Sequence, residues 1–300
     1  MSNPVFLLVD GLAAVYRAFH AIPELTARDG RPTNALFGFI RMLQQLEQRW
    51  RPAYELVVFD GGLPEERMAR LPTYKAQRPP MPEPLHAQLE PIGAYLSAAG
   101  RAGLRVPGQE ADDVIATLSA RAVERGMDVL IATGDKDLFQ LIDERVGMVA
   151  LSKSEEKIGA AQVMEKTGVP PALVVDWLAL TGDSVDNIPG LPGVGPKTAS
   201  RWLLQYGSLE KLLERRAEIG NPRFRAALES GMEIVRRNVE LMKLRRDLPV
   251  EFDGAAWRVR PSDPSVLLRF YEKMDLESLA RPLRPAEPAP GQGMLDFGGG

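Results

Sequence analysis

Three carboxylates stand within four residues of this chain, at Glu110, Asp112 and Asp113, immediately before an apolar helical pattern. Carboxylates this close repel one another, and no basic residue is interleaved to neutralise them. The N-terminus of a helix offers only partial positive charge, worth about 0.3 to 1 kcal/mol for each exposed anion. A divalent metal ion compensates such a cluster better, so this segment predicts a metal site.

Further carboxylates follow short apolar runs that are typical of buried strands. The runs span residues 5–9, 56–59 and 129–132. The acidic residues that follow them are Asp10, Asp60, Asp135 and Asp137. Runs that are apolar on both faces and alternate with helical patterns, here 36–50, 85–99 and 111–124, predict a parallel, doubly wound α/β sheet. Because ligands bind beyond the carboxyl ends of such strands, we expect these carboxylates to converge on one rim.

A further acidic pair, Asp183 and Asp186, follows the apolar run at 174–180. Their spacing places both side chains on one side of a helical turn or tight loop. The chain has no Cys and only two His, and all-oxygen ligation favours Mg²⁺ or Mn²⁺ over zinc. The carboxylates exceed what one octahedral ion can use, so we expect two ions, about 4 Å apart as in two-metal hydrolases.

Each acidic residue taken alone is more simply explained as a helix cap or a turn residue. That explanation fails for the set, because caps do not require a carboxylate at the end of every strand. The predicted metal ligands are Asp10, Asp60, Glu110, Asp112, Asp113, Asp135, Asp137, Asp183 and Asp186. We assign the first four to one ion, directly or through water, and the other five to a second ion.

A glycine-rich turn at 190–195 follows the second acidic pair and precedes a helical pattern. Outward-pointing amides at the start of such a helix bind a phosphate without regard to the base. The candidate DNA-binding residues are Gly193, Val194, Gly195, Lys197 and Thr198. Downstream, over residues 197–246, basic residues outnumber acidic ones about two to one, which is consistent with nucleic-acid binding. An ordinary turn between helices and a solvated helical face are the alternative explanations.

A basic segment at 67–84 follows the strand that ends at Asp60. It contains Arg67, Arg70, Tyr74, Lys75 and Arg78 and ends in a proline-rich stretch. A basic loop or helical arch at this place would overhang the acidic rim, where its cations would grip a scissile phosphate and offset charge in the transition state. Tyr74 would stack on a base. The alternative is a surface loop whose charges only keep the chain soluble.

These motifs, in this order, resemble the 5' nuclease family of 5'-3' exonucleases and flap endonucleases, most closely the N-terminal domain of bacterial DNA polymerase I. The resemblance runs from about Phe6 to Pro282. It rests on Val-Asp10-Gly with Tyr16-Arg17-Ala-Phe, Thr33-Asn34-Ala, Val-Phe-Asp60, Tyr74-Lys75-Ala-Gln-Arg78-Pro, Gln-Glu110-Ala-Asp112-Asp113, Thr-Gly-Asp135-Lys-Asp137 and Gly-Asp183-Ser-Val-Asp186-Asn. Gly61-Gly62 and Val185 depart from the family pattern, but neither departure removes a carboxylate.

The resemblance implies a PIN-like α/β core with a central, mostly parallel twisted sheet over residues 1–170, including a helical arch at about 62–86. It implies a helical DNA-binding subdomain with a helix-three-turn-helix over 171–283. It also implies two Mg²⁺ ions, which Mn²⁺ can replace, a K⁺ ion at the helix-three-turn-helix, and passage of single-stranded 5' DNA through the arch. The residues expected to act on the scissile phosphate are Lys75, Arg78, Tyr74 and Arg17.

Composition is consistent with a cytoplasmic monomer that has no membrane attachment. The chain has 300 residues, of which 45% are hydrophobic, with neither an 18-residue apolar span nor a secretion signal. Absence of Cys excludes disulfides and thiol chemistry. A formal net charge of -3 is unusual for a DNA-binding protein. The contradiction is resolved if the acid is concentrated at a metal site, where bound cations invert its sign.

The last residues, 284–300, form a Pro/Gly-rich tail that cannot build a core. Within it, Gln292, Leu295 and Phe297 make a Gln-x-x-Leu-x-Phe pattern that resembles the peptide by which bacterial replication proteins bind the sliding clamp. A linker toward a polymerase module is the alternative explanation.

We therefore predict a Mg²⁺-dependent, structure-specific 5' nuclease that cuts DNA near single-strand/double-strand junctions and leaves 5'-phosphate and 3'-hydroxyl ends. Its expected substrates are 5'-flap, nicked or gapped duplexes, as in primer and flap removal during replication and repair. DNA polymerase I is expected as a functional partner or as a fused module. The competing hypothesis is a non-catalytic junction-binding relative, against which the intact carboxylates argue. An RNase of the related PIN type is disfavoured, because such proteins lack the helix-three-turn-helix.

Overall fold

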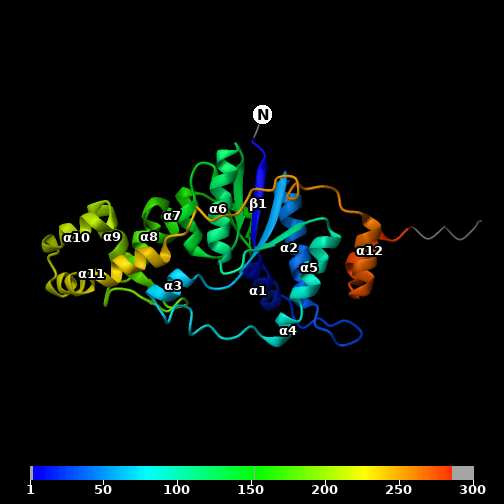
Figure 1. Cartoon of the computed structure of the whole chain (residues 1–300), viewed down its shortest axis with the longest axis horizontal. Helices are drawn as coiled ribbons and strands as arrows, with labels where there is room; N and C mark the ends of the chain where they lie inside the picture. The colour runs from blue at the N-terminus through cyan, green and yellow to red at the C-terminus, as the bar shows by residue number, and fades with distance from the viewer. Residues whose placement is uncertain (1–2, 152, 286–300) are drawn as a thin grey trace, which may run out of the picture.

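A six-stranded sheet forms the centre of the computed structural model, which describes residues 3–151 and 153–285 (Figure 1). The strands are β1 (Val5–Asp10), β2 (Tyr54–Phe59), β3 (Ala102–Arg105), β4 (Asp128–Ala132), β5 (Val146–Ala150) and β6 (Lys153–Ile158). Their order is β3-β2-β1-β4-β5-β6, and every neighbouring pair is parallel except β5 and β6. The predicted α/β fold with a mostly parallel sheet is confirmed.

Both faces of the sheet are covered, which explains why its central strands are apolar over most of their length. Leu7 and Val9 of β1 point into a core shared with α1 (Gly11–Ala21), α2 (Asn34–Trp50) and α5 (Leu89–Ala98). Phe6 and Leu8 point the other way, into a core shared with α6 (Ala111–Glu124). The three apolar runs of the sequence correspond to β1, β2 and β4. The strands β3, β5 and β6 were not predicted, because β3 contains a glycine and β6 is largely charged.

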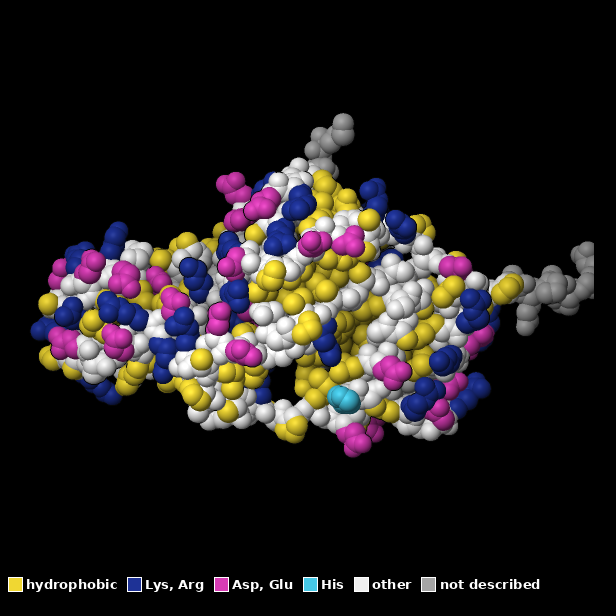
Figure 2. Space-filling model, in the orientation of Figure 1, with side chains coloured by type: hydrophobic (Ala, Val, Ile, Leu, Met, Phe, Trp, Pro, Cys, Tyr) yellow, Lys and Arg dark blue, Asp and Glu magenta, His cyan; other side chains and the backbone are white. Residues whose placement is uncertain are grey.

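The segment predicted as a helical arch is helical only near its two ends. It contains α3 (Glu65–Arg70) and α4 (Glu83–His86), with turns and extended chain between them. Prolines interrupt the middle, because proline lacks an amide hydrogen and restricts the residue before it; they are Pro72, Pro79, Pro80 and Pro82. The single helix predicted over 85–99 is likewise two helices, α4 and α5. Figure 2 shows an opening between this segment and the core.

A helical lobe follows the sheet and lies at one end of the molecule (Figure 1). The elements that lead into it are η1 (Lys136–Leu141), α7 (Ala160–Thr167) and η2 (Pro171–Leu173). It then comprises α8 (Val174–Thr181), the hairpin of β7 (Gly182–Asp183) and β8 (Ile188–Pro189), α9 (Pro196–Tyr206), α10 (Leu209–Glu214), η3 (Arg216–Glu218) and α11 (Pro222–Met242). Within the lobe α11 packs along α8, and the lobe is joined to the rest of the chain by contacts of α11 with α3 and of α8 with η1.

The predicted helical subdomain, 171–283, extends further than the lobe itself. After α11 the chain returns to the sheet, where the amide of Glu55 donates to the carbonyl of Trp257 at 2.8 Å. The last elements are α12 (Pro264–Lys273), α13 (Glu277–Ala280) and η4 (Arg281–Leu283). They pack on the α2 and α5 side, where the rings of Tyr271 and Tyr95 stack at 6.4 Å between centroids. Residues beyond about 243 therefore belong to the core by their packing.

Two further predictions concern the C-terminal tail and membrane attachment. The candidate clamp-binding residues, Gln292, Leu295 and Phe297, lie outside the described residues. Among the helices of the described chain, none combines the length and the apolar character needed to cross a bilayer.

A buried carboxyl group at the start of β2 makes the stability of the fold depend on pH. Glu55 is 1% exposed, and within the described structure neither of its carboxylate oxygens has a hydrogen-bond partner. Arg101 lies 3.6 Å away but binds Glu47 more closely, at 2.7 Å. Burial, reinforced by the charge of Glu47, raises the pKa of Glu55 well above its ordinary 4.5. Folding therefore penalises the ionised form of Glu55.

We predict that replacing Glu55 by Gln raises the free energy of unfolding at pH 8 by about 1 kcal/mol or more, since one pKa unit corresponds to about 1.4 kcal/mol. The stability that protonated Glu55 contributes is complete below pH 4.5 and is lost as the pH rises toward its raised pKa in the folded chain. Urea unfolding across this pH range measures the effect, with the exposed Glu233→Gln as control. Identical pH slopes for Glu55→Gln and the parent would contradict it.

Candidate metal centre and nucleic-acid interface

The carboxyl ends of the central strands bring acidic side chains to one rim of the sheet. Asp10 ends β1 and caps α1, where it accepts from the amide of Ala13 at 3.1 Å. Asp60 follows β2 and accepts from the amide of Ala111 at 3.0 Å, at the start of α6. Thr133, after β4, donates its hydroxyl to Asp10 at 2.8 Å. Asp10 and Asp60 therefore serve as helix caps while they also face the other carboxylates.

The acidic side chains form two overlapping groups. Burial raises the pKa of Asp10 to about 6, and repulsion from Asp60 and Asp135 acts in the same direction. Burial also raises the pKa of Asp112, which is repelled by the same neighbours and by Asp10. In the second group, burial raises the pKa of Asp137 to about 8, reinforced by the charges of Asp135, Asp183 and Asp186. Asp135 belongs to both groups, so they form one continuous acidic basin.

The donor set of this basin fits a hard divalent cation. All of its ligating atoms are carboxylate oxygens, which Mg²⁺ and Mn²⁺ prefer. One of them, Oδ1 of Asp137, is buried and has no hydrogen-bond partner within the described part of the chain. In the same described part, no three acidic side chains already stand in the geometry of a coordination shell. The carboxylates would therefore have to draw together around an ion, which offsets their mutual repulsion.

Cations from the segment between α3 and α4 contact the acidic basin. The ammonium of Lys75 contacts Glu110 and lies 3.6 Å from Asp186. The guanidinium of Arg78 contacts Asp186 as well, and its side chain is 47% exposed. As expected from the sequence, this segment brings the cations of Lys75 and Arg78 into contact with the acidic rim.

Two side chains of this segment lie differently from what the sequence suggested. Tyr74 is 4% exposed, and its hydroxyl donates to Glu110 at 3.1 Å. Its ring is therefore covered and does not offer a stacking surface for a base. Arg67 is 6% exposed and binds Glu110 and Asp113, so it does not offer a free charge to a phosphate. The sequence pattern does not distinguish these buried groups from their exposed neighbours.

Asp113 differs from the other predicted ligands in its surroundings. It is fully buried, and both of its oxygens are bound by Arg67, at 2.6 and 2.9 Å. One of these oxygens also accepts from the amide of Arg245 at 2.9 Å. The assignment of Asp113 to a second metal ion stays a prediction.

A short hairpin presents Asp183 and Asp186. Oδ1 of Asp183 accepts from the amide of Val185 at 2.7 Å, which fixes the turn. Gly182 has a φ of +71°, and a Cβ atom on it would lie 2.3 Å from the amide nitrogen of Gly190. Only glycine therefore fits where the strands of the hairpin meet. The predicted convergence of Asp183 and Asp186 on the basin agrees with their charge interactions with Asp135.

Two residues that the sequence analysis did not single out also act at this hairpin. Lys136 forms an ion pair with Asp183 at 2.9 Å, and Asn187 donates to the carbonyl of Thr73 at 2.8 Å. The amide of Lys75 donates to the carbonyl of Asp186 at 3.0 Å. The hairpin thus holds the basic segment by its backbone. Lys136 could have been identified from the sequence, because it stands between the predicted ligands Asp135 and Asp137.

Most of the remaining candidate residues lie on the surface of the molecule. In the glycine-rich turn, Val194 is buried, whereas Gly193, Gly195 and Lys197 are exposed and Thr198 is half-buried. Gly193 has a φ of +79°. Arg17 is exposed on α1, the helix that Asp10 caps. Figure 2 shows Lys and Arg interspersed with acidic side chains over the lobe of α9 to α11.

We predict that Asp137→Asn raises the stability of the chain in EDTA and removes its stabilisation by Mn²⁺. Asn is neutral, so it relieves repulsion among buried carboxylates but supplies a poorer ligand for a divalent ion. The increase should be at least ~1 kcal/mol at a pH above about 8.

Thermal unfolding with and without Mn²⁺ measures both effects, and Asp247→Asn, at a side chain that is 80% exposed, is the control. A variant that Mn²⁺ still stabilises as it does the parent would show that Asp137 is not a ligand.

Two adjoining sequence families match this chain. One is described as 5'-3' exonuclease, N-terminal resolvase-like domain, and covers residues 5–168. The other is described as 5'-3' exonuclease, C-terminal SAM fold, and covers residues 169–265. The 5'-3' exonuclease of Aquifex aeolicus is 39% identical over 274 residues, which are 91% of this chain and 93% of that protein. DNA polymerase I of Rhizobium leguminosarum is also 39% identical, but the chain spans only 28% of its length.

Solved structures share the fold at lower identity. A T5 5'-exonuclease with bound zinc superposes with a TM-score of 0.67 at 22% identity, over 92% of this chain and 99% of that one. The catalytic core of Rad2 in complex with a DNA substrate gives a TM-score of 0.61 at 15% identity, over 94% and 93% of the two chains. The resolvase-like core and the helical lobe are therefore an arrangement that other chains adopt.

Proposed function

The chain belongs to the 5'-3' exonuclease family, and we propose that it is a divalent-metal-dependent nuclease that cuts DNA at junctions between single and double strands. The observation that carries this proposal is the acidic basin, in which carboxylates from several strand ends meet beneath Lys75 and Arg78. Buried like charges of this kind are costly unless cations bind among them. The opening between the basic segment and the core supports passage of a single strand (Figure 2).

We assign the acidic residues to binding of two Mg²⁺ ions, with Mn²⁺ as a substitute. Such ions, when bound, supply an activated water and stabilise charge on the attacking and leaving oxygens of a phosphodiester. Asp10, Asp60, Asp112 and Asp135 form the first group of ligands by their mutual charge interactions. Asp135, Asp137, Asp183 and Asp186 form the second. Glu110 stands between the basin and the cations of the basic segment.

Lys75 and Arg78 are the side chains that we assign to the scissile phosphate. Arg78 is 47% exposed at the edge of the basin, where negative charge develops during hydrolysis. Lys75 is 9% exposed and paired with Glu110 and Asp186, so we propose that it reaches the phosphate when metal ions bind these carboxylates. We also assign Arg17, which is exposed on α1, to contact with the same strand. The glycine-rich turn and Lys197 would bind the backbone of the duplex through amides and charge, and a K⁺ ion in that turn is part of this proposal. The products would carry 5'-phosphate and 3'-hydroxyl ends.

Two wider assignments follow from the relatives. The polymerase relatives are longer than this chain, so we propose that it works beside or fused to a DNA polymerase I in primer and flap removal. We propose a cytoplasmic location, since these relatives are bacterial proteins of DNA metabolism. Binding to a sliding clamp through Gln292, Leu295 and Phe297 stays a prediction.

A labelled 5'-flap duplex, incubated beside a labelled nicked duplex, tests the proposed activity and separates the two modes of cleavage. We predict cleavage of both in Mg²⁺ and none in EDTA, with products one or a few nucleotides from the junction. Tight binding of the flap without cleavage in either Mg²⁺ or Mn²⁺ would instead favour the non-catalytic junction binder.

Removing the two proposed phosphate-binding charges should have different consequences. Lys75→Ala should lower the single-turnover rate by about 10²-fold or more with little change in affinity, because its charge acts on the transition state. Lys197→Ala should weaken duplex binding and reduce the slope of log affinity against log salt by about one.

Fluorescence anisotropy with flap DNA in Ca²⁺, paired with quenched-flow cleavage in Mg²⁺, measures both quantities. The exposed Lys166→Ala serves as the control. The same profile for Lys75→Ala and Lys197→Ala would contradict this division of roles.

A further inference from the structure

One buried arginine on α3 connects the acidic basin to the helical lobe. The guanidinium of Arg67 is enclosed between α3, α6 and the end of α11, and its side chain is 8% exposed. Its Nε donates to the carbonyl of Leu241 at 2.9 Å, and one Nη donates to the carbonyl of Lys243 at 3.3 Å. The remaining contacts are to Glu110, which immediately precedes α6, and to Asp113 within it. We call Arg67 with these four partners the Arg67 fork.

The Arg67 fork uses the full hydrogen-bonding capacity of the side chain. A guanidinium has five N–H donors in a fixed plane, and Arg67 makes five hydrogen bonds: to Leu241, Glu110, Lys243 and twice to Asp113. A lysine at this position offers three donors from one point and cannot reproduce the two parallel bonds to Asp113. Geometry, as well as charge, is therefore required here.

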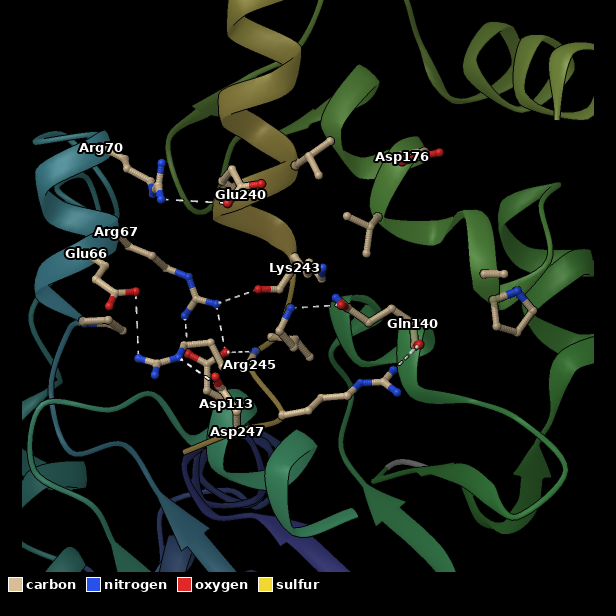
Figure 3. Close-up of a pocket in the computed structure, with 17 residues that line it drawn as sticks. Glu66, Arg67, Arg70, Asp113, Gln140, Asp176, Glu240, Lys243, Arg245 and Asp247 are labelled. Atoms are coloured by element: carbon tan, nitrogen blue, oxygen red, sulfur yellow. Dashed lines mark hydrogen bonds and ion pairs between the residues drawn. The ribbon is translucent and has the colours of Figure 1, made fainter. Parts of the chain in front are cut away.

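The same end of α11 is held from the opposite side by η1, the element that carries Asp137. Gln140 donates to the carbonyl of Met242 at 2.9 Å and accepts from the amide of Leu244 at 3.0 Å. It also donates to the carbonyl of Asp137 itself, at 2.9 Å. Figure 3 shows Arg67 and Gln140 reaching the chain around Lys243 from two sides. Residues 241–245 are thus fixed to both flanks of the basin.

The Arg67 fork lies between the basin and the outer surface. Arg67 lines a cleft of about 730 Å³ between α3, α8 and the end of α11, and Asp113 lies in the same wall (Figure 3). Arg67 also lines the small pocket that contains Glu110, Asp112 and Asp186. Its charge is therefore neutralised by Glu110 and Asp113 inside the protein, in the wall between these two spaces.

We propose that Arg67 is a positioning residue that fixes the metal-binding face of α6 only while the end of α11 is docked against it. Glu110 is oriented by Arg67 together with Tyr74 and Lys75, and Asp113 holds the guanidinium in place. Residues that orient metal ligands from behind typically change metal affinity by about 10- to 100-fold when they are replaced. This inference rests on the proposed binding of divalent ions by the basin. It adds that the helical lobe and the metal site are energetically coupled.

Calorimetric titration of Mn²⁺ into the full chain without DNA tests the proposal. Arg67→Lys retains the charge but cannot form the fork, and it should weaken Mn²⁺ binding by about 10- to 100-fold. Arg70→Lys is the matched control one turn along α3, because Arg70 is 50% exposed and makes only a 3.8 Å ion pair with Glu240 (Figure 3). It should bind Mn²⁺ within about twofold of the parent.

The outcomes separate this inference from the proposed function. If the parent binds Mn²⁺ and Arg67→Lys binds it equally well, even with a lower melting temperature, then Arg67 only supports the fold and the inference is wrong. If the parent itself binds no Mn²⁺, the proposed metal function fails, and the coupling fails with it.

A measurement on the parent chain covers the case in which Arg67→Lys does not fold. Coupling is reciprocal, so Mn²⁺ must stabilise the end of α11 by as much as the docked end favours the ion. Hydrogen exchange should therefore slow at residues 239–245 on addition of Mn²⁺, while α10 in the same lobe changes little. Unchanged exchange at 239–245, with Mn²⁺ bound, would overturn the proposal.

Discussion

Repulsion among buried carboxylates at the rim of the sheet is the constraint on which the rest of the structure depends. Parallel strands deliver Asp10, Asp60 and Asp135 to one place because their carboxyl ends lie side by side. Burial makes this repulsion costly, as the raised pKa of Asp137 shows. Hydroxyl, amide and ammonium groups offset part of it, from Thr133, Ala111 and Lys136. The remaining negative charge makes the basin suited to divalent cations.

The surrounding elements can be understood as supports for this basin. The hairpin that carries Asp186 also holds the backbone of Lys75, so the acidic loop and the basic segment are fixed relative to each other. The end of α11 is held by Arg67 on one side and by Gln140 on the other. These contacts connect the helical lobe to the carboxylates. We propose that the same lobe binds duplex DNA. Substrate binding and metal binding would then depend on the same packed segment.

Sequence reasoning found the basin because its signal is local: an apolar run followed by an acidic residue, repeated along the chain. It found Lys75 as a cation near the rim for the same reason. It could not distinguish Arg67 and Tyr74 from exposed residues, since their burial depends on α6 and α11, which are distant in sequence. It did not anticipate the packing of the last residues, because no local pattern reveals that the chain after 243 returns to β2 and α5. β3 was missed because its glycine and exposed arginine weaken the strand pattern.

The most direct test of the account is a crystal of the full chain soaked in Mn²⁺ and measured at the manganese absorption edge. The account predicts anomalous density within the basin, in contact with carboxylate oxygens of Asp112 and Asp135, and a second peak on the side of Asp137 and Asp183. Density confined to the surface of the molecule, or none at all with ordered carboxylates, would contradict the claim that this basin exists to hold metal ions.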